Sequence, residues 1–143
     1  MYTEQFLKNI IEKYIPFHQV LKMQLVFVRE GYAQIRVPYA PELVGDPRSG
    51  RLHGGVISTA MDAAGGAAAI TTLGHHEDQL STIDMRVDYL YPGKPLDILV
   101  SGEIVKDGST VIFTRMWAQH PDEEKLIAEA RAIYRVRRQQ EEG

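Results

Sequence analysis

The strongest constraint on the fold is the segment 54–72, in which one ionisable side chain, Asp62, interrupts an uncharged run rich in alanine and glycine. The run leaves few positions that would prefer water, which predicts a helix buried nearly all round. Its apolar content is mostly alanine, and it carries four Ser and Thr residues, so it would insert poorly into lipid. We therefore expect a long helix inside a soluble protein.

Strand-like patterns follow this helix without further helical segments between them. Ile83, Met85 and Val87 alternate with charged residues, which predicts a half-buried strand with these three side chains facing the core. Similar runs follow at residues 96–104, 110–119 and 126–136, and two more precede the helix at residues 23–28 and 32–38. Runs of strands without helices between them are typical of an α+β architecture, here a curved antiparallel sheet around one long helix.

The ends of the chain complete the predicted layout. Residues 3–15 place apolar side chains at helical spacing, with Thr3 as N-cap. The charged tail 137–143 is expected to fray. No repeat or linker divides the sequence, so we predict a single domain, 1–143.

The composition excludes several kinds of site. There are no cysteines, which rules out a disulfide, a thiolate nucleophile and a Cys-ligated metal. The net charge of -3 argues against a nucleic-acid partner. Residues 75–78 include metal-ligand types, but neighbours in one loop seldom converge on an ion, so we predict neither metal nor cofactor. Charges interrupt the N-terminal apolar residues, unlike a secretory signal, and we expect a cytoplasmic protein without a membrane partner.

Asp62 is the first candidate for a reacting group. Burying an isolated carboxylate costs free energy, and Asp is a poor helix former, so neither packing nor helix propensity explains it. Neighbouring donors and burial together tune carboxylates at reacting sites. A structural Asp that bonds a neighbouring element is the alternative.

The residues that open the helix are the second candidate. Unpaired N–H groups at a helix start can stabilise an oxyanion, and Gly54 and Gly55 let a ligand approach the backbone. Glycines at a helix start also occur for steric reasons, and His53 can act simply as a cap. Eight residues separate Gly54 from Asp62, about 12 Å of helical rise, so one chain cannot bring both to one carbonyl. Two antiparallel helices in a homodimer could bring Gly54 of one subunit and Asp62 of the other to the same carbonyl.

Residues 51–69 (RLHGGVISTAMDAAGGAAA) resemble the signature of the hot-dog thioesterases of the PaaI-like, phenylacetate-pathway family. That signature is His-Gly-Gly followed, after six residues, by an Asp in the central helix. The order of elements, including the stretch 82–93, resembles the family over nearly the whole chain. The resemblance implies a hot-dog fold and hydrolysis of acyl-CoA thioesters by dimers or by dimers of dimers.

The resemblance also implies a role for each residue of the motif. Asp62 would be the general base or nucleophile, and the Gly54 N–H would polarise the thioester carbonyl with Gly55 beside it. His53 would hold the loop, and Thr82 falls where several relatives have a Ser or Thr that positions the attacking water.

The chain departs from the family at one contact. Many relatives have an Asn about six residues before the motif histidine, where this chain has Pro47, which has no side-chain donor. Its neighbour Asp46 is therefore a further candidate for substrate binding. The departure leaves the rate and the acyl preference open.

Two other functions stay open from the residues alone: a hot-dog hydratase or dehydratase acting on enoyl-CoA, and a non-catalytic protein that binds acyl-CoA. The cations that could meet the phosphates of coenzyme A are Arg48, Arg51, Lys94, Arg137 and Arg138. The aromatic side chains that could line an acyl pocket, or simply the core, are Tyr89, Tyr91, Phe113 and Trp117.

Overall fold

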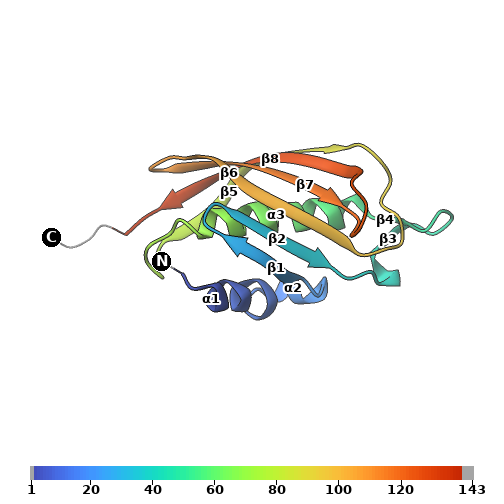
Figure 1. The fold of residues 1–143 in the computed structure, drawn as a ribbon, viewed down its shortest axis with the longest axis horizontal. Coiled ribbons are helices and arrows are strands. Elements are labelled where there is room, and N and C mark those ends of the chain that lie inside the picture. Colours follow the sequence, from blue (N-terminus) through green and yellow to red (C-terminus); the bar gives the residue numbers. More distant parts are fainter. Residues whose placement is uncertain (1, 140–143) are drawn as a thin grey trace.

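The computed structural model describes residues 2–139, and Figure 1 shows its arrangement. Thr3 caps α1 (Glu4–Asn9) by accepting a hydrogen bond from the Phe6 N–H at 3.1 Å. The predicted helix 3–15 is α-helical only at its start, because it continues as a π-helical turn, η1 (Ile10–Tyr14). The residue before a proline avoids helical backbone, and Ile15 is extended ahead of α2 (Pro16–Val20).

Six antiparallel strands form one sheet in the order β1-β2-β6-β7-β8-β5. Their bounds are β1 Gln24–Arg29, β2 Tyr32–Val37, β5 Gln79–Tyr89, β6 Ile98–Asp107, β7 Val111–Gln119 and β8 Leu126–Arg137. The loop between β2 and the long helix α3 (Gly54–Ile70) holds a short turn, η2 (Pro41–Leu43), and a two-stranded ribbon of β3 (Val44–Asp46) and β4 (Arg51–Leu52). The sheet curves around α3 (Figure 1), which confirms the α+β, hot-dog architecture.

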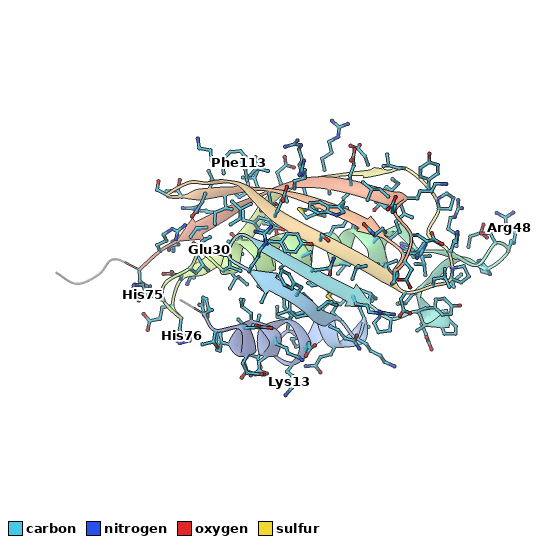
Figure 2. All side chains as sticks on the ribbon, viewed as in Figure 1. Lys13, Glu30, Arg48, His75, His76 and Phe113 are labelled. Atoms are coloured by element: carbon cyan, nitrogen blue, oxygen red, sulfur yellow. The ribbon has the colours of Figure 1, made fainter. Side chains whose placement is uncertain are left out.

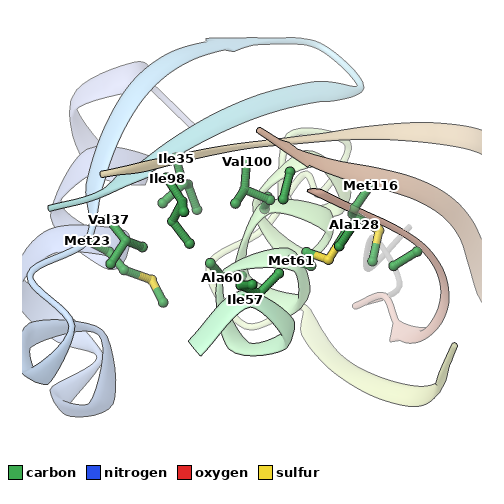
Figure 3. Packing of buried hydrophobic residues seen from close by; sticks show 14 of the residues in the cluster. Met23, Ile35, Val37, Ile57, Ala60, Met61, Ile98, Val100, Met116 and Ala128 are labelled. Atoms are coloured by element: carbon green, nitrogen blue, oxygen red, sulfur yellow. The ribbon is translucent and has the colours of Figure 1, made fainter. Parts of the chain in front are cut away.

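The core lies between the sheet and one face of α3 (Figure 3). Helix and sheet approach closely where β6 carries Gly102, because a Cβ there would lie 2.6 Å from the Ala64 carbonyl. The opposite face of α3 includes Thr59, Asp62 and Gly66, which are only half-buried. Burial nearly all round is therefore wrong for α3, since the N-terminal helices cover this second face only in part.

Strand β5 lies at one edge of the sheet and pairs with β8 alone. The register shifts between Thr82 and Asp84, which makes Ile83 the extra residue of a β-bulge. The predicted inward position of Ile83 is wrong, since its side chain is 56% exposed. Met85 and Val87 do pack against the core as the alternation indicates.

The C-terminal end of the described chain is tied to its neighbours. Arg138 donates to the Thr72 carbonyl at 3.0 Å, and the Gln139 N–H donates to Asp78 at 2.7 Å. The rest of the expected frayed tail, residues 140–143, lies outside the described residues. Between residues 2 and 139, none of the helices has the length and apolar character needed to cross a bilayer.

Candidate active site

Asp62 lies midway along α3, and two hydroxyl groups hold one of its carboxylate oxygens. The Thr82 hydroxyl donates to Oδ1 at 2.8 Å, and the Tyr134 hydroxyl lies 3.1 Å from the same atom. The Tyr134 hydroxyl also lies 2.8 Å from the backbone carbonyl of Asp62. Within residues 2–139, Oδ2 accepts no hydrogen bond. The carboxylate is thus held through one oxygen and presents the other.

The β5 bulge explains why Thr82 can reach Asp62. Thr82 pairs with Tyr134 of β8, and Met85 pairs with Ala132, so all four face α3 in spite of the odd spacing along β5. If Ile83 were paired as in a regular strand, strict alternation from Met85 would turn Thr82 away from the helix. The bulge therefore aims the Thr82 hydroxyl at the carboxylate, as bulges often do near functional sites.

A small cavity of about 150 Å³ opens beside Asp62. The N-terminal helices contribute Ile11 and His18 to its lining, and α3 contributes Ala63, Gly66 and Ala67. The His18 ring Nδ1 lies 3.2 Å from the Ile11 carbonyl, which fits Nδ1–H as the donor. Burial lowers the pKa of His18 from its ordinary value, which favours the neutral form of its ring. The space around the carboxylate is therefore largely apolar.

At the start of α3 the two glycines differ in what their N–H groups do. The Gly55 N–H donates to the His53 ring Nδ1 at 2.8 Å, which makes His53 the N-cap. The Gly54 N–H meets no acceptor within the described chain. The Tyr89 ring packs against Gly54, since a Cβ there would lie 3.2 Å from Tyr89 Cε1. Only Gly54 thus offers an unoccupied donor.

Two larger cavities meet at this helix start. One of about 450 Å³ is lined by His53, Gly54, Tyr89 and Tyr91. The other, of about 630 Å³, has a mostly apolar lining: Phe17, Val20, Leu21, Leu43 and Val56 beside His53 and Gly55. The helix start therefore borders space for both a polar and an apolar part of a ligand.

This arrangement, a half-buried helical carboxylate behind an uncapped glycine N–H, occurs in a chain with many relatives. The sequence profile of the thioesterase superfamily matches residues 49–127. The medium/long-chain acyl-CoA thioesterase YigI of Escherichia coli is 34% identical to this chain, over 94% of it and 96% of YigI. The chain belongs to the thioesterase superfamily.

Solved structures agree. A protein from Shewanella oneidensis related to the thioesterase superfamily superposes with a TM-score of 0.84 at 28% identity, covering 93% of this chain and 94% of its own. A thioesterase from Haemophilus influenzae superposes with a TM-score of 0.83 over 99% of this chain and 95% of its own. Its identity of 17% shows the shared fold alone. This superfamily member is a thioester hydrolase.

The thioesterase chain does not bring its two candidate groups together by itself. Gly54 is the first residue of α3 and Asp62 the ninth, about 12 Å apart along the axis. No cavity of the described residues is lined by both. If both groups act on one carbonyl, they must come from different chains.

Asp46 is the last residue of β3, and Pro47 begins the turn that leads to β4. The Asp46 carboxylate accepts from the Arg48 N–H at 3.1 Å and from the Ser49 hydroxyl at 3.1 Å. The Arg48 backbone N–H is the main reason that the pKa of Asp46 lies below its ordinary value. These bonds occupy Asp46 within its own turn, and its contact with substrate stays a prediction.

Most of the cations suggested for coenzyme A have acidic partners. Arg48 and Arg51 pair with Asp46, Lys94 pairs with Glu123, and Arg138 pairs with Asp107. Arg48 projects into solvent at the end of the molecule opposite His75 and His76 (Figure 2). Among the described residues, no three His, Asp or Glu side chains gather as metal ligands would.

The suggested aromatic lining divides between two faces. Tyr89 and Tyr91 line the cavity at Gly54. Phe113 and Trp117 alternate with the buried Ile112, Met116 and Ala118, so they lie on the face of the sheet away from α3.

Sequence reasoning missed Tyr134 and His18. Tyr134 falls in a strand whose pattern indicates ordinary core, and it lies beyond the residues that the superfamily profile matches. His18 falls between the predicted first helix and the first strand. Neither carries a local signal of its place beside Asp62, because tertiary packing brings both residues to the same cavity.

Proposed function

We propose that this thioesterase hydrolyses acyl-CoA to a free acid and coenzyme A, with Asp62 and Gly54 contributed to each site by different subunits. The observation that carries the proposal is the hydrogen bonding of the Asp62 carboxylate: two hydroxyls hold Oδ1, while Oδ2 accepts no hydrogen bond from residues 2–139. A carboxylate that only stabilised the fold would be expected to use both oxygens. The free Gly54 N–H supplies the complementary donor.

In the general-base form of the reaction, Oδ2 takes a proton from water as the water oxygen attacks the thioester carbonyl. The carbonyl oxygen becomes an oxyanion, which the Gly54 N–H at the positive end of α3 stabilises. The C–S bond then breaks, and the departing sulfur takes a proton to give free coenzyme A. In the nucleophilic form, Oδ2 attacks the carbonyl, the C–S bond breaks and the coenzyme A thiolate leaves and takes a proton. Water then hydrolyses the mixed anhydride to the free acid and restores the Asp62 carboxylate.

The exposed edge of the sheet supports a dimer as the catalytic unit. β5 has eleven residues and pairs on one side only, and such edges normally find cover. Pairing two β5 edges about a two-fold axis would make the two α3 helices antiparallel. The Gly54 end of one helix would then run toward the partner's Asp62. One such pair would complete two sites.

The apolar cavity supports an acyl chain of medium or greater length. It opens beside His53 and Gly55, adjacent to the Gly54 donor, and offers aliphatic and aromatic side chains to a hydrocarbon. YigI, the relative that matches along nearly its whole length, is named for medium- and long-chain acyl-CoA. A thiol-release assay over acyl chains from two to eighteen carbons measures the preference directly.

Asp62→Asn tests the catalytic carboxylate. The amide keeps the shape and the acceptor Oδ1 but cannot take a proton, so we expect turnover to fall by about 10²–10⁴-fold with acyl-CoA binding retained. Asp122→Asn is the matched control, because Asp122 lies in an exposed turn at φ 65, which Asn also tolerates. Unchanged hydrolysis by Asp62→Asn would refute the assignment.

Gly54→Pro tests the oxyanion donor. Proline is well accepted at the first position of a helix, and it removes the N–H. Gly54→Ala is the control, because it keeps the N–H and places its Cβ against Tyr89 in the same way. We expect the proline variant to lose about 10²-fold or more relative to the alanine variant. Equal rates for the two would show that the N–H takes no part.

Thiol release, together with the enoyl absorbance of crotonyl-CoA, separates the remaining alternatives. Loss of the enoyl absorbance of crotonyl-CoA without thiol release would indicate a hydratase. Tight binding across the acyl panel without thiol release would indicate a binding protein.

A further inference from the structure

Tyr134 is buried next to Asp62, yet the mechanism above gives it no part. We propose that Tyr134 is a positioning residue of the thioesterase: with Thr82 it fixes the Asp62 carboxylate so that Oδ2 faces the substrate. This inference rests on the proposed function, because it assigns the orientation of the group that reacts there.

The burial of Tyr134 restricts it to an indirect role. Its side chain is 2% exposed and meets the small cavity beside Asp62 only as part of the cavity wall, where its hydroxyl is already bonded to Asp62. Its hydroxyl lies 2.8 Å from the Asp62 carbonyl and 3.1 Å from Oδ1. One proton is thus shared between the backbone and the side chain of the same residue. This contact ties the carboxylate to the helix that carries it.

The Tyr134 hydroxyl keeps its proton near neutral pH. Burial, followed by the negative charge of Asp62, raises the pKa of Tyr134 far above 10.0. The group therefore acts as a hydrogen-bond donor and not as an acid or base. A donor of this kind favours the ionised carboxylate that the reaction needs.

The two donors come from different strands of one rigid sheet. Thr82 lies on β5 and Tyr134 on β8, and the two residues pair in the register of these strands. Both hydroxyls end on the same oxygen, which leaves the carboxylate little freedom to rotate. Holding a reacting group in one orientation before substrate arrives lowers the cost of reaching the reactive geometry.

Gly65 of α3 leaves the space that the Tyr134 hydroxyl occupies next to Asp62. A Cβ at Gly65 would lie 2.6 Å from the Tyr134 hydroxyl and 2.9 Å from the Met116 sulfur. A larger residue there would push the hydroxyl away from Asp62. The close approach of the Tyr134 hydroxyl thus explains why a glycine occupies position 65.

Tyr134→Phe removes the hydroxyl and keeps the ring. We expect kcat with acyl-CoA to fall by about 10–100-fold, while KM changes less than about twofold, because the group does not touch substrate. The Thr82 hydroxyl still donates to Asp62 Oδ1 in this variant, so the carboxylate loses one of its two donors and keeps the other.

Tyr32→Phe is the matched control. The Tyr32 hydroxyl donates to Ser101 at 3.2 Å on the sheet face away from α3, and this variant should keep the wild-type kcat and KM. An unchanged kcat in Tyr134→Phe would overturn the proposal, as would a loss that appears in KM and not in kcat. Equal losses in both variants would also overturn it, because they would reflect a general effect of tyrosine hydroxyls on the fold.

Crystal structures of the wild type and of Tyr134→Phe give a readout that does not depend on turnover. We expect one Asp62 carboxylate orientation in the wild type and at least two in the variant. If neither protein releases thiol from any acyl-CoA but the orientations differ in this way, the proposed function fails while the positioning contact stands. An Asp62 that keeps one orientation in the variant overturns the contact as well.

Discussion

Two adjacent glycines of α3 should respond to the same substitution with opposite signs. A Cβ at Gly65 would lie 2.6 Å from the Tyr134 hydroxyl and 2.9 Å from the Met116 sulfur. A Cβ at Gly66 would meet only Tyr134 Cε1, at 3.7 Å, which is ordinary contact. The two positions share one helix and one chemical change, so helix propensity alone would predict the same result for both.

The magnitudes follow from these contacts. Replacing a mid-helix glycine by alanine stabilises by roughly 0.5–1 kcal/mol where the methyl group fits. At Gly65 the methyl group must displace the buried, hydrogen-bonded Tyr134 hydroxyl, and such overpacking costs about 1–3 kcal/mol. The net loss for Gly65→Ala is then roughly 1–2 kcal/mol. With about 4 °C per kcal/mol for a chain of this size, Tm should fall by roughly 4–8 °C.

Thermal unfolding of both variants at one protein concentration is the assay. Gly66→Ala should raise Tm by roughly 2–4 °C, while Gly65→Ala lowers it and also lowers kcat, because the displaced hydroxyl releases Asp62. Equal shifts in Tm for the two variants would refute the packing argument. If Gly65→Ala lost stability but kept the full kcat, the packing argument would stand and the role of the Tyr134 hydroxyl in orienting Asp62 would be refuted.

Three further predictions concern the helix, its cap and the buried histidine. Gly102→Ala should destabilise the protein by about 1–3 kcal/mol, because its Cβ would meet the Ala64 carbonyl at 2.6 Å and helix backbone cannot move aside as the end of a side chain can. The loss should appear as a lower urea midpoint of unfolding, and an unchanged midpoint would contradict this prediction. His53→Ala should lower the free energy of unfolding by about 0.5–2 kcal/mol in the same urea titration, because it removes the acceptor of the Gly55 N–H. His53→Asn can still cap the helix and should recover part of that loss. Burial lowers the pKa of His18, so its stabilising contribution is present above pH 6.5 and is lost as pH falls toward the folded-state pKa. The free energy of unfolding should therefore fall between pH 7.5 and 5.5, and His18→Gln should show a smaller fall; the same pH dependence in both proteins would exclude His18 as its source.

The sequence pattern predicts the helix and strands well because their periodicity is local. The uncharged run at 54–72 matches α3, and the alternation in the second half matches the last four strands of the large sheet. The β-bulge at Ile83 could not be predicted, since neither glycine nor proline marks it and the alternation runs through it undisturbed. As a result, the pattern would place Thr82 on the wrong face, and only the family resemblance pointed to it.

The site divides in the same way. His53, Gly54 and Asp62 share one short segment, so their spacing is visible in the sequence. Tyr134 reaches Asp62 from 72 residues along the chain, and the contact depends on β8 lying under α3 with a glycine opposite. Asp46 was expected near substrate, but the turn that follows it supplies hydrogen bonds that the sequence does not reveal.

The central claim is that each site joins Asp62 of one subunit to Gly54 of the other. Co-expressing Asp62→Asn chains with Gly54→Pro chains under two affinity tags, and purifying the mixed dimer through both, tests it most directly. Each mixed dimer would hold one site with both groups intact and one with neither, so its thiol release should reach about half of the wild-type rate while each parent homodimer stays nearly inactive. A mixed dimer as inactive as its parents would contradict the claim, because it would place Asp62 and Gly54 of the same chain in one site.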